Sequence, residues 1–116
     1  MTSVRKSNSV LGWINDKKVY IAGPLFSHAE LEFNEKIDIY LRNLGFETFL
    51  PQRDGYLLAD LMAQYSNKQE AIDIIFYKDI EEIKSCDVIL LILDGRVPDE
   101  GACVEVGLAY AYNKDV

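Results

Sequence analysis

The sequence is poor in the residues that build disulfide frameworks, metal centres and histidine-dependent catalysts. Its 116 residues include two cysteines, Cys86 and Cys103, and one histidine, His28. The cysteines lie in apolar helical surroundings without metal-ligand spacing, so we interpret them as reduced, structural thiols of a cytoplasmic protein. His28 stands early in a helix, where a surface or capping role fits it better than catalysis. A Ser–His–Asp mechanism would have only this histidine to use, so catalysis should rely on carboxylates.

Positively charged residues and long apolar runs are also scarce. Lys and Arg number 12 against 19 Asp and Glu, which gives a net charge of −7. This balance argues against binding to nucleic acid or to anionic membranes, although it leaves room for a nucleoside or another small ligand. No apolar run approaches the roughly 18 residues of a membrane span, and no signal-peptide pattern opens the chain. No glycine-rich phosphate loop of either common spacing occurs, and we expect neither a metal nor another cofactor.

What the sequence does contain is an alternation of strand and helix signals. Residues 1–16 lack periodicity and are predicted to form an N-terminal lead-in, whereas 17–116 are predicted to form one domain. Short β-branched or apolar runs predict three strands, at 18–22, 46–50 and 87–93. Apolar periodicity predicts three main helices, at 27–45, about 70–85 and from 101 onward. The segment 51–69 is irregular and should be a loop that carries a short helical piece.

This alternation predicts an α/β fold of the flavodoxin-like (Rossmann-like) type, a parallel sheet with helices on both faces in three layers. Sheets of this type usually have about five strands, and only three are visible. Asp115 and Val116 resemble the first step of a fourth. We therefore expect the C-terminal part of the fold, and of any site, to be missing from this chain.

The first predicted helix has clear boundaries. Ser27 and Glu30 have the spacing of an N-terminal capping box, and Gly45 follows the last turn. Four residues at helical spacing should form its inward stripe: Phe33, Ile37, Tyr40 and Leu41.

Two carboxylates stand on apolar faces of the later helices. The helix from 101 onward is apolar on nearly every side, which is typical of a buried helix, yet Glu105 lies in its second turn. Asp79 falls within an apolar stripe made of Ile72, Ile75, Phe76, Ile80 and Ile83. Burying a carboxylate without a partner costs several kcal/mol. Each acid therefore either makes a structural hydrogen bond or serves a functional site.

Position in the chain favours a functional site for these acids. Ligands of open parallel sheets bind outside the carboxyl ends of the strands. The loop 94–101 follows the third strand and leads directly into the helix of Glu105. Gly23 and Pro51 follow the other two strands, so all three segments can converge on one crevice.

The start of the Glu105 helix adds further candidates. Asp99 could be a third functional acid, although N-capping alone would account for it. Gly101 and Gly107 each cost a helix roughly 1 kcal/mol relative to alanine. They would either keep the face of Glu105 clear for a ligand or permit close packing of the helix on the sheet.

With these residues in this order, the chain resembles the nucleoside 2-deoxyribosyltransferases from about Lys18 to Lys114. The segments that carry the resemblance are "VYIAGPLFS", "YKDIEEIKSCDVILLIL" and "DEGACVEVGLAYA". The resemblance implies a flavodoxin-like fold and an enzyme that moves 2-deoxyribose between nucleobases, with deoxyribonucleosides and free bases as substrates. It also implies a homo-oligomer built from dimers, up to a hexamer, in which a neighbouring subunit completes each site. Part of that surface would come from C-terminal residues that this chain lacks.

The resemblance also implies roles for individual residues. Glu105 would be the nucleophile that attacks the anomeric carbon. Asp79 and Asp99 would hold the base and help to protonate it as it leaves. The remaining positions would contact the substrate: Tyr20, Gly23, Phe26, Gln52, Asp54 and Gly101.

The chemistry of retaining glycosyl transfer agrees with these residues. One carboxylate forms a covalent ester with the sugar, and a second carboxyl group protonates the leaving base. The apolar surroundings of Asp79 should raise its pKa, as a proton donor requires. Glu105 must stay charged, so we expect it to accept a hydrogen bond from a hydroxyl such as that of Tyr20.

Two other functions fit parts of the pattern. Deoxynucleoside monophosphate glycosidases share the Glu-aliphatic-Gly helix but hydrolyse the bond, and they hold a 5′-phosphate with small polar residues of the first loop. Here that loop offers only Ser27 and His28. A non-catalytic nucleotide-binding or receiver-like module is the second alternative, but a receiver needs clustered acids where Gly23 and Pro24 stand. We therefore favour transfer between nucleosides and free bases.

Overall fold

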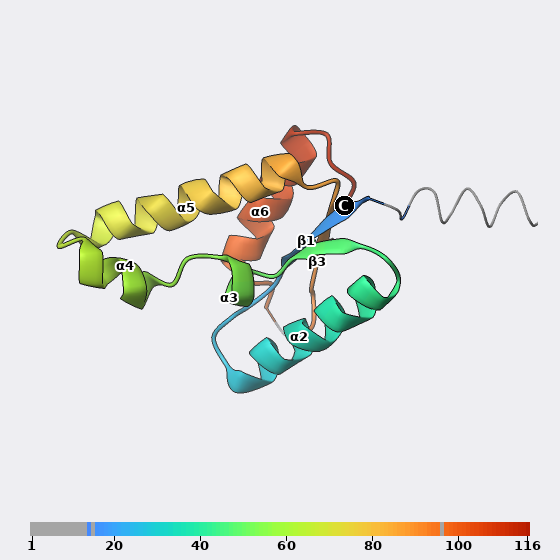
Figure 1. The fold of residues 1–116 in the computed structure, drawn as a ribbon, viewed down its shortest axis with the longest axis horizontal. Helices are drawn as coiled ribbons and strands as arrows, with labels where there is room; N and C mark the ends of the chain where they lie inside the picture. The colour runs from blue at the N-terminus through green and yellow to red at the C-terminus, as the bar shows by residue number, and fades with distance from the viewer. Residues whose placement is uncertain (1–13, 15, 96) are drawn as a thin grey trace, which may run out of the picture.

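The computed structural model describes residues 14, 16–95 and 97–116. At its centre is a parallel sheet of three strands in the order β2-β1-β3 (Figure 1). The strands are β1 (Lys18–Ala22), β2 (Glu47–Phe49) and β3 (Val88–Leu91). All three predicted strands are thus confirmed, the second and third being shorter than predicted. The lead-in predicted for 1–16 lies almost wholly outside the described residues and stays a prediction.

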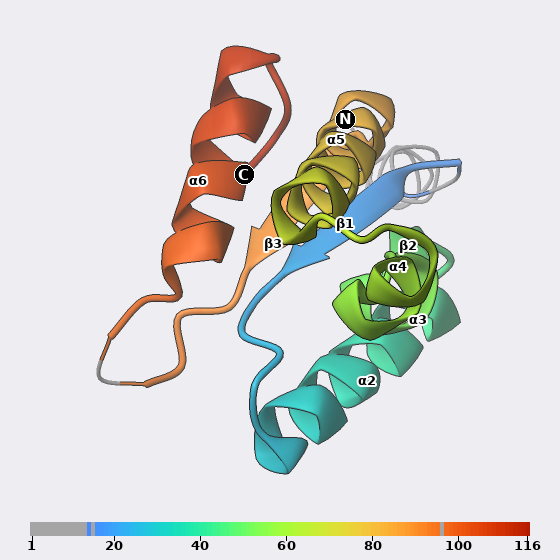
Figure 2. The same ribbon diagram turned by 90° about the vertical axis from the view of Figure 1, so that its left-hand side faces the viewer.

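Helices cover both faces of the sheet (Figures 1 and 2). On one face lies α2 (His28–Asn43), and on the other lie α5 (Lys68–Ser85) and α6 (Glu100–Ala111). Two short helices, α3 (Pro51–Asp54) and α4 (Leu58–Gln64), connect β2 to α5. The predicted three-layer α/β fold is therefore confirmed. None of the helices in the described part of the chain is long and apolar enough to span a membrane.

Alternate residues of β1 divide the core between the two faces. Val19 and Ile21 pack with Leu41 of α2 in one cluster of buried side chains. Tyr20 and Ala22 belong to the other cluster, which includes buried residues of α5 and α6. This is the two-residue period of a strand, and it turns Tyr20 toward the helix that carries Glu105.

The boundaries of α2 are those that the sequence predicts. The Ser27 hydroxyl accepts the Glu30 backbone N–H at 3.1 Å, and a Glu30 carboxylate oxygen accepts the Ser27 N–H at 2.7 Å. These two bonds confirm the capping box. Gly45 has a φ of 106°, a left-handed conformation that glycine adopts without strain, and it turns the chain from α2 toward β2.

The inward stripe predicted for α2 is correct in only two of its four positions. Leu41 is buried, and Ile37 packs against the same cluster. Phe33 and Tyr40 are exposed, contrary to the prediction. The buried face of α2 is therefore rotated away from the stripe that the apolar residues define.

Two polar residues, Asn34 and Asp38, occupy that buried face instead. Asn34 donates a hydrogen bond to the backbone carbonyl of Pro24 at 3.0 Å, and Asp38 accepts one from Arg53 at 2.8 Å. These partners come from the segments that follow β1 and β2. Because the polar groups are paired there, their burial is not penalised as an unpaired group would be.

Helix α6 is less buried than its apolar sequence predicts. Ala102 and Ala109 are buried, whereas Val104 and Tyr110 are 53% and 78% exposed. The helix packs against α5, β3 and β1 at one edge of the molecule (Figure 2). The expectation of a helix buried on all sides is wrong for this chain, because only one side of α6 has a neighbour among the described elements.

The two cysteines differ in their surroundings. Cys86 is buried after the last turn of α5, as expected for a structural thiol. Cys103 is exposed on α6, so its interpretation as a structural thiol is wrong. Both thiols are free.

The last residues of the chain pair with the free edge of β3. Asp115 forms a parallel bridge with Val88. The Ile89 N–H donates to the Asp115 carbonyl at 2.8 Å, and the Asp115 N–H donates to the Asp87 carbonyl at 3.2 Å. This single bridge agrees with the predicted first step of a fourth strand, although no fourth strand is formed by the described residues.

Candidate active site

Glu105 is held by the hydroxyl group of Tyr20. Tyr20 lies in the middle of β1, is 0% exposed, and donates a hydrogen bond to Oε2 of Glu105 on α6. Its ring stacks on Phe49 of β2, with the ring centroids 4.9 Å apart and the rings inclined by 22°. The hydrogen bond confirms the hydroxyl partner expected for Glu105, and the stack fixes the ring from which that hydroxyl projects.

Glu105 lines a cavity of about 190 Å³ at the carboxyl ends of the strands. Its wall comes from segments that follow all three strands and from the middle of α5, as the strand-end argument predicts. The lining residues are Gly23, Leu25, Phe26, Pro51, Asp79, Asp99, Gly101 and Glu105. The structure thus brings all three candidate acids together in one cavity, with three of the predicted substrate contacts around them.

Two of these lining residues, Leu25 and Pro51, were not predicted as site residues. Both adjoin the turns that end β1 and β2, and that position was the only signal in the sequence. Phe26, which was predicted, is 86% exposed at the cavity. An exposed aromatic side chain is therefore part of the cavity wall.

Asp79 reaches the cavity from the middle of α5. Burial raises its pKa to about 6, while Lys78 opposes that shift and Glu82 adds to it. The apolar stripe predicted around Asp79 is buried only in part, because Ile83 is fully buried but Ile72 is exposed. The first half of α5 extends beyond the sheet and packs beside α4 (Figure 1), where Ala71 is its only buried residue.

Asp99 both caps α6 and lines the cavity. Its Oδ2 accepts the backbone N–H of Ala102 at 2.8 Å, which is the N-cap hydrogen bond. The structural role considered for this residue is therefore present. The same carboxylate is one of the three acids that line the cavity, so the cap does not remove Asp99 from the site.

The pKa of Glu105 responds to burial and to the two other acids of the cavity. Burial raises the pKa of Glu105 to about 7, and the charges of Asp79 and Asp99 add to the shift. The hydrogen bond from Tyr20 acts the other way and favours the charged carboxylate. The pKa of Tyr20 is itself raised, chiefly by burial and then by Glu105, so its hydroxyl stays protonated and remains a donor.

The glycines near the acids have different surroundings. A Cβ on Gly101 would lie 3.3 Å from Oδ2 of Asp99, and one on Gly23 would lie 3.1 Å from the Ile92 side chain. A Cβ on Gly107 would meet no atom within 4 Å. The expectation that glycine keeps the face of Glu105 clear thus fits Gly101. Neither that expectation nor close packing of the helix on the sheet explains Gly107.

Gln52 and Asp54 are both held by hydrogen bonds to other parts of the fold. The amide of Gln52 donates to the Leu31 carbonyl at 2.8 Å and accepts from Asn34 at 3.3 Å. Asp54 accepts hydrogen bonds from the side chain of Arg53 and from a backbone N–H. Neither residue belongs to the lining of the Glu105 cavity, and their roles as substrate contacts stay predictions.

His28 lies outside the cavity. The His28 side chain is exposed and lies 4.0 Å from Glu32, which agrees with a surface position. Across the residues that the structure describes, no three His, Cys, Asp or Glu side chains are grouped so that they could hold a metal ion.

Fold and site together define a parallel α/β protein with a cluster of three carboxylates at the carboxyl ends of its strands. Residues 19–116 match the family model of the nucleoside 2-deoxyribosyltransferases. The chain therefore belongs to the nucleoside 2-deoxyribosyltransferase family. A search of curated proteins found no match.

Two solved structures support this assignment. A conserved protein from Enterococcus faecalis V583 is 31% identical, with a TM-score of 0.71 over 84% of this chain and 59% of that protein. The 2-deoxyribosyltransferase of Bacillus psychrosaccharolyticus is 28% identical, with a TM-score of 0.67 over 84% of this chain and 67% of that enzyme. The chain thus spans about three fifths of the Enterococcus protein and two thirds of the Bacillus enzyme.

Proposed function

We propose that the protein transfers 2-deoxyribose between nucleobases through a covalent deoxyribosyl ester of Glu105. The observation that carries the proposal is the cavity in which Glu105, held by Tyr20, lies with Asp79 and Asp99. Membership of the family and the likeness to a characterised 2-deoxyribosyltransferase support the same reaction class.

In the first half of the reaction, a carboxylate oxygen of Glu105 forms a bond to the anomeric carbon of the nucleoside. Because Oε2 accepts the hydrogen bond from Tyr20, Oε1 is the attacking atom. The bond between that carbon and the base nitrogen breaks, its electron pair stays on the nitrogen, and Asp79 supplies a proton. Asp99 holds the base as it leaves.

In the second half, the nitrogen of an incoming base attacks the same carbon. The ester bond breaks and returns its electron pair to Glu105, while Asp79 takes the proton of the incoming base. Two inversions give net retention at the anomeric carbon.

The pKa values set a condition on this mechanism. Burial raises the pKa of Glu105 to about 7 and that of Asp79 to about 6, so either acid can hold a proton near neutral pH. The mechanism needs the proton on Asp79. A base nitrogen that accepts a hydrogen bond from protonated Asp79 favours that form, and neutral Asp79 in turn favours charged Glu105. We therefore propose that substrate binding transfers the proton to Asp79.

The size of the cavity supports completion of the site by a neighbouring subunit. Ligand pockets usually enclose about 300–1,000 Å³, whereas this cavity encloses about 190 Å³. Such a space suits the sugar but leaves much of the base uncovered. We propose a homo-oligomer in which a second copy supplies the remaining wall.

Hydrolysis of nucleoside monophosphates is less well supported. Three acids line the cavity and its described lining contains no Lys, Arg or His, so a 5′-phosphate would meet charge of its own sign. Ser27 is occupied by the capping box, and His28 points to solvent. These residues favour a substrate without a phosphate.

The test supplies the purified protein with deoxyinosine and adenine. Appearance of deoxyadenosine would support transfer, and release of free deoxyribose alone would indicate hydrolysis. Trapping with a 2-fluoro-2-deoxyribosyl nucleoside, followed by mass spectrometry, should place the adduct on Glu105, and Glu105→Gln should give none. An adduct on another residue of an active enzyme would end the assignment of Glu105.

A further inference from the structure

One buried acid has no part in the proposed chemistry. Asp38 on α2 is 2% exposed and lies outside the lining of the Glu105 cavity. Its carboxylate accepts hydrogen bonds from the Thr48 hydroxyl and from Nη1 of Arg53, the latter at 2.8 Å. Arg42, on the same helix, places a guanidinium nitrogen 3.6 Å away.

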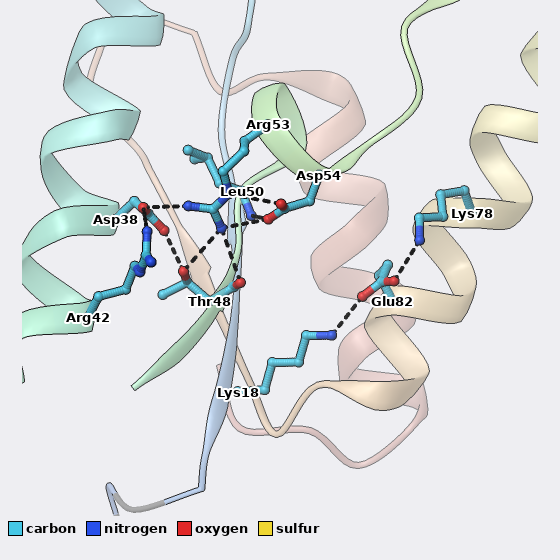
Figure 3. Close-up of polar contacts among 9 residues, drawn as sticks. All are labelled: Lys18, Asp38, Arg42, Thr48, Leu50, Arg53, Asp54, Lys78 and Glu82. Atoms are coloured by element: carbon cyan, nitrogen blue, oxygen red, sulfur yellow. Dashed lines mark hydrogen bonds and ion pairs between the residues drawn. The ribbon is translucent and has the colours of Figure 1, made fainter. Parts of the chain in front are cut away.

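Arg53 joins this acid to a second one (Figure 3). Its Nε and Nη2 donate to the two carboxylate oxygens of Asp54 at 2.8 and 2.6 Å. Asp54 in turn accepts the backbone N–H of Leu50 at 2.9 Å. One guanidinium thus connects α2 with both ends of α3, through the planar, forked geometry that only arginine has.

Helix α3 needs such an anchor. It has four residues, Pro51–Asp54, and its N-cap, Leu50, makes no side-chain cap. A single helical turn is too short to be stable by its own backbone hydrogen bonds. Yet Pro51, the first residue of α3, is part of the wall of the Glu105 cavity.

We propose that Arg53 is a positioning residue for the proposed reaction: by tying α3 to Asp38, it holds Pro51 in place against the substrate. This inference rests on the proposed transferase function. Arg53 lies outside the lining of the Glu105 cavity, and its side chain contacts Asp38, Asp54 and Thr48 instead. A wall that contacts the substrate and the transition state equally contributes to binding and not to the chemical step. Loss of Arg53 should therefore raise KM more than it lowers kcat.

The experiment compares Arg53→Gln with Arg42→Gln in the purified protein. Both variants remove one positive charge beside Asp38, but Arg42 has no hydrogen bond or ion pair to α3. We expect Arg53→Gln to raise KM for the nucleoside about tenfold with kcat changed by less than about threefold. Arg42→Gln should leave both constants unchanged, and Arg53→Lys should restore part of the loss.

Hydrogen exchange gives a readout that does not depend on activity. The backbone N–H groups of Arg53, Asp54 and Gly55 all donate within this turn, to the carbonyls of Leu50 and Pro51. Their exchange should be faster in Arg53→Gln and unchanged in Arg42→Gln. Measurements well below the thermal midpoint separate this local effect from global unfolding.

Several results would overturn the inference. Equal increases of KM in the two variants would mean that charge alone matters, and a lowered thermal midpoint with unchanged KM would mean a purely structural role. If Arg53→Gln does not fold, the double variant Asp38→Asn/Arg53→Gln is used in its place, because it leaves no unpaired charge at the buried Asp38 position. Absence of transfer by the unaltered protein would show instead that the proposed function has failed, and the positioning role would fail with it.

Discussion

The hydroxyl of Tyr20 donates a hydrogen bond to Oε2 of Glu105, which links the central strand of the sheet to α6. The bond opposes the effect of burial and of two neighbouring acids on the pKa of Glu105. A residue from the core thus favours the charged form of a residue in the cavity.

Tyr20→Phe should lower activity by making Glu105 harder to ionise. Without the hydroxyl, the pKa of Glu105 should rise above its present value of about 7, because a bond to the charged form is lost. A hydrogen bond to a charged group contributes about 1.5–3 kcal/mol, so kcat/KM near pH 6 should fall about tenfold to a hundredfold. In a pH–rate profile the acid limb should move to higher pH. Tyr110→Phe, on the exposed side of α6, is the control, and an unshifted limb in Tyr20→Phe would contradict the prediction.

Glu105→Gln should stabilise the fold at high pH. The pKa of Glu105 is about 7 in the folded protein against an ordinary 4.5. The folded state therefore binds more protons between about pH 4 and 7, and its free energy of unfolding falls as pH rises through that range. The variant should be more stable by about 1–3 kcal/mol at pH 8 and equally stable at pH 4. Chemical denaturation at both pH values measures the difference, and a gain that is independent of pH would refute this account.

Asp99→Asn and Asp99→Ala should separate the two roles of Asp99. An asparagine still accepts the Ala102 N–H as an N-cap, whereas alanine does not and should cost about 1 kcal/mol of stability. Both variants lose the acid, so both should lose activity. Thermal melts and initial rates of transfer test this together. Full activity in Asp99→Asn would show that capping is the only function of the residue.

Gly101→Ala should lower activity without lowering stability. Alanine favours a helix by up to about 1 kcal/mol over glycine, but its Cβ would lie 3.3 Å from Oδ2 of Asp99 and displace that carboxylate. Gly107→Ala is the matched control, since its Cβ meets nothing within 4 Å and it should raise the thermal midpoint at unchanged kcat/KM. Equal activity of the two variants would argue against a role for the contact with Asp99.

The strands and the grouping of the acids could be predicted because their signals are local. Apolar runs and turn residues mark the strand ends, and the rule that ligands bind at those ends brings Asp79, Asp99 and Glu105 together. The burial of Asn34 and Asp38 could not be predicted in this way. Their partners come from other segments, 10 and 15 residues away, and only the folded structure shows that the polar atoms are paired.

The exposure of α6 escaped prediction for a related reason. An apolar sequence shows that a helix face can be buried, but whether it is buried depends on which elements flank it. In the described structure nothing packs against the side that carries Val104 and Tyr110. The position of Pro51 in the cavity wall could not be predicted either, because it depends on how α3 is anchored to its neighbours.

Because side chains along β1 alternate between the two faces of the sheet, the site depends on the exact number of residues in this strand. Tyr20 faces Glu105, while Val19 and Ile21 face α2. Inserting or deleting one residue before Tyr20 within the strand would reverse every side chain beyond that point. The phenol would then be placed among the leucines and isoleucines of the opposite layer, and Glu105 would lose its donor although the sequence kept both residues. A change of one residue in the length of this strand would therefore disrupt the site even if every site residue were kept.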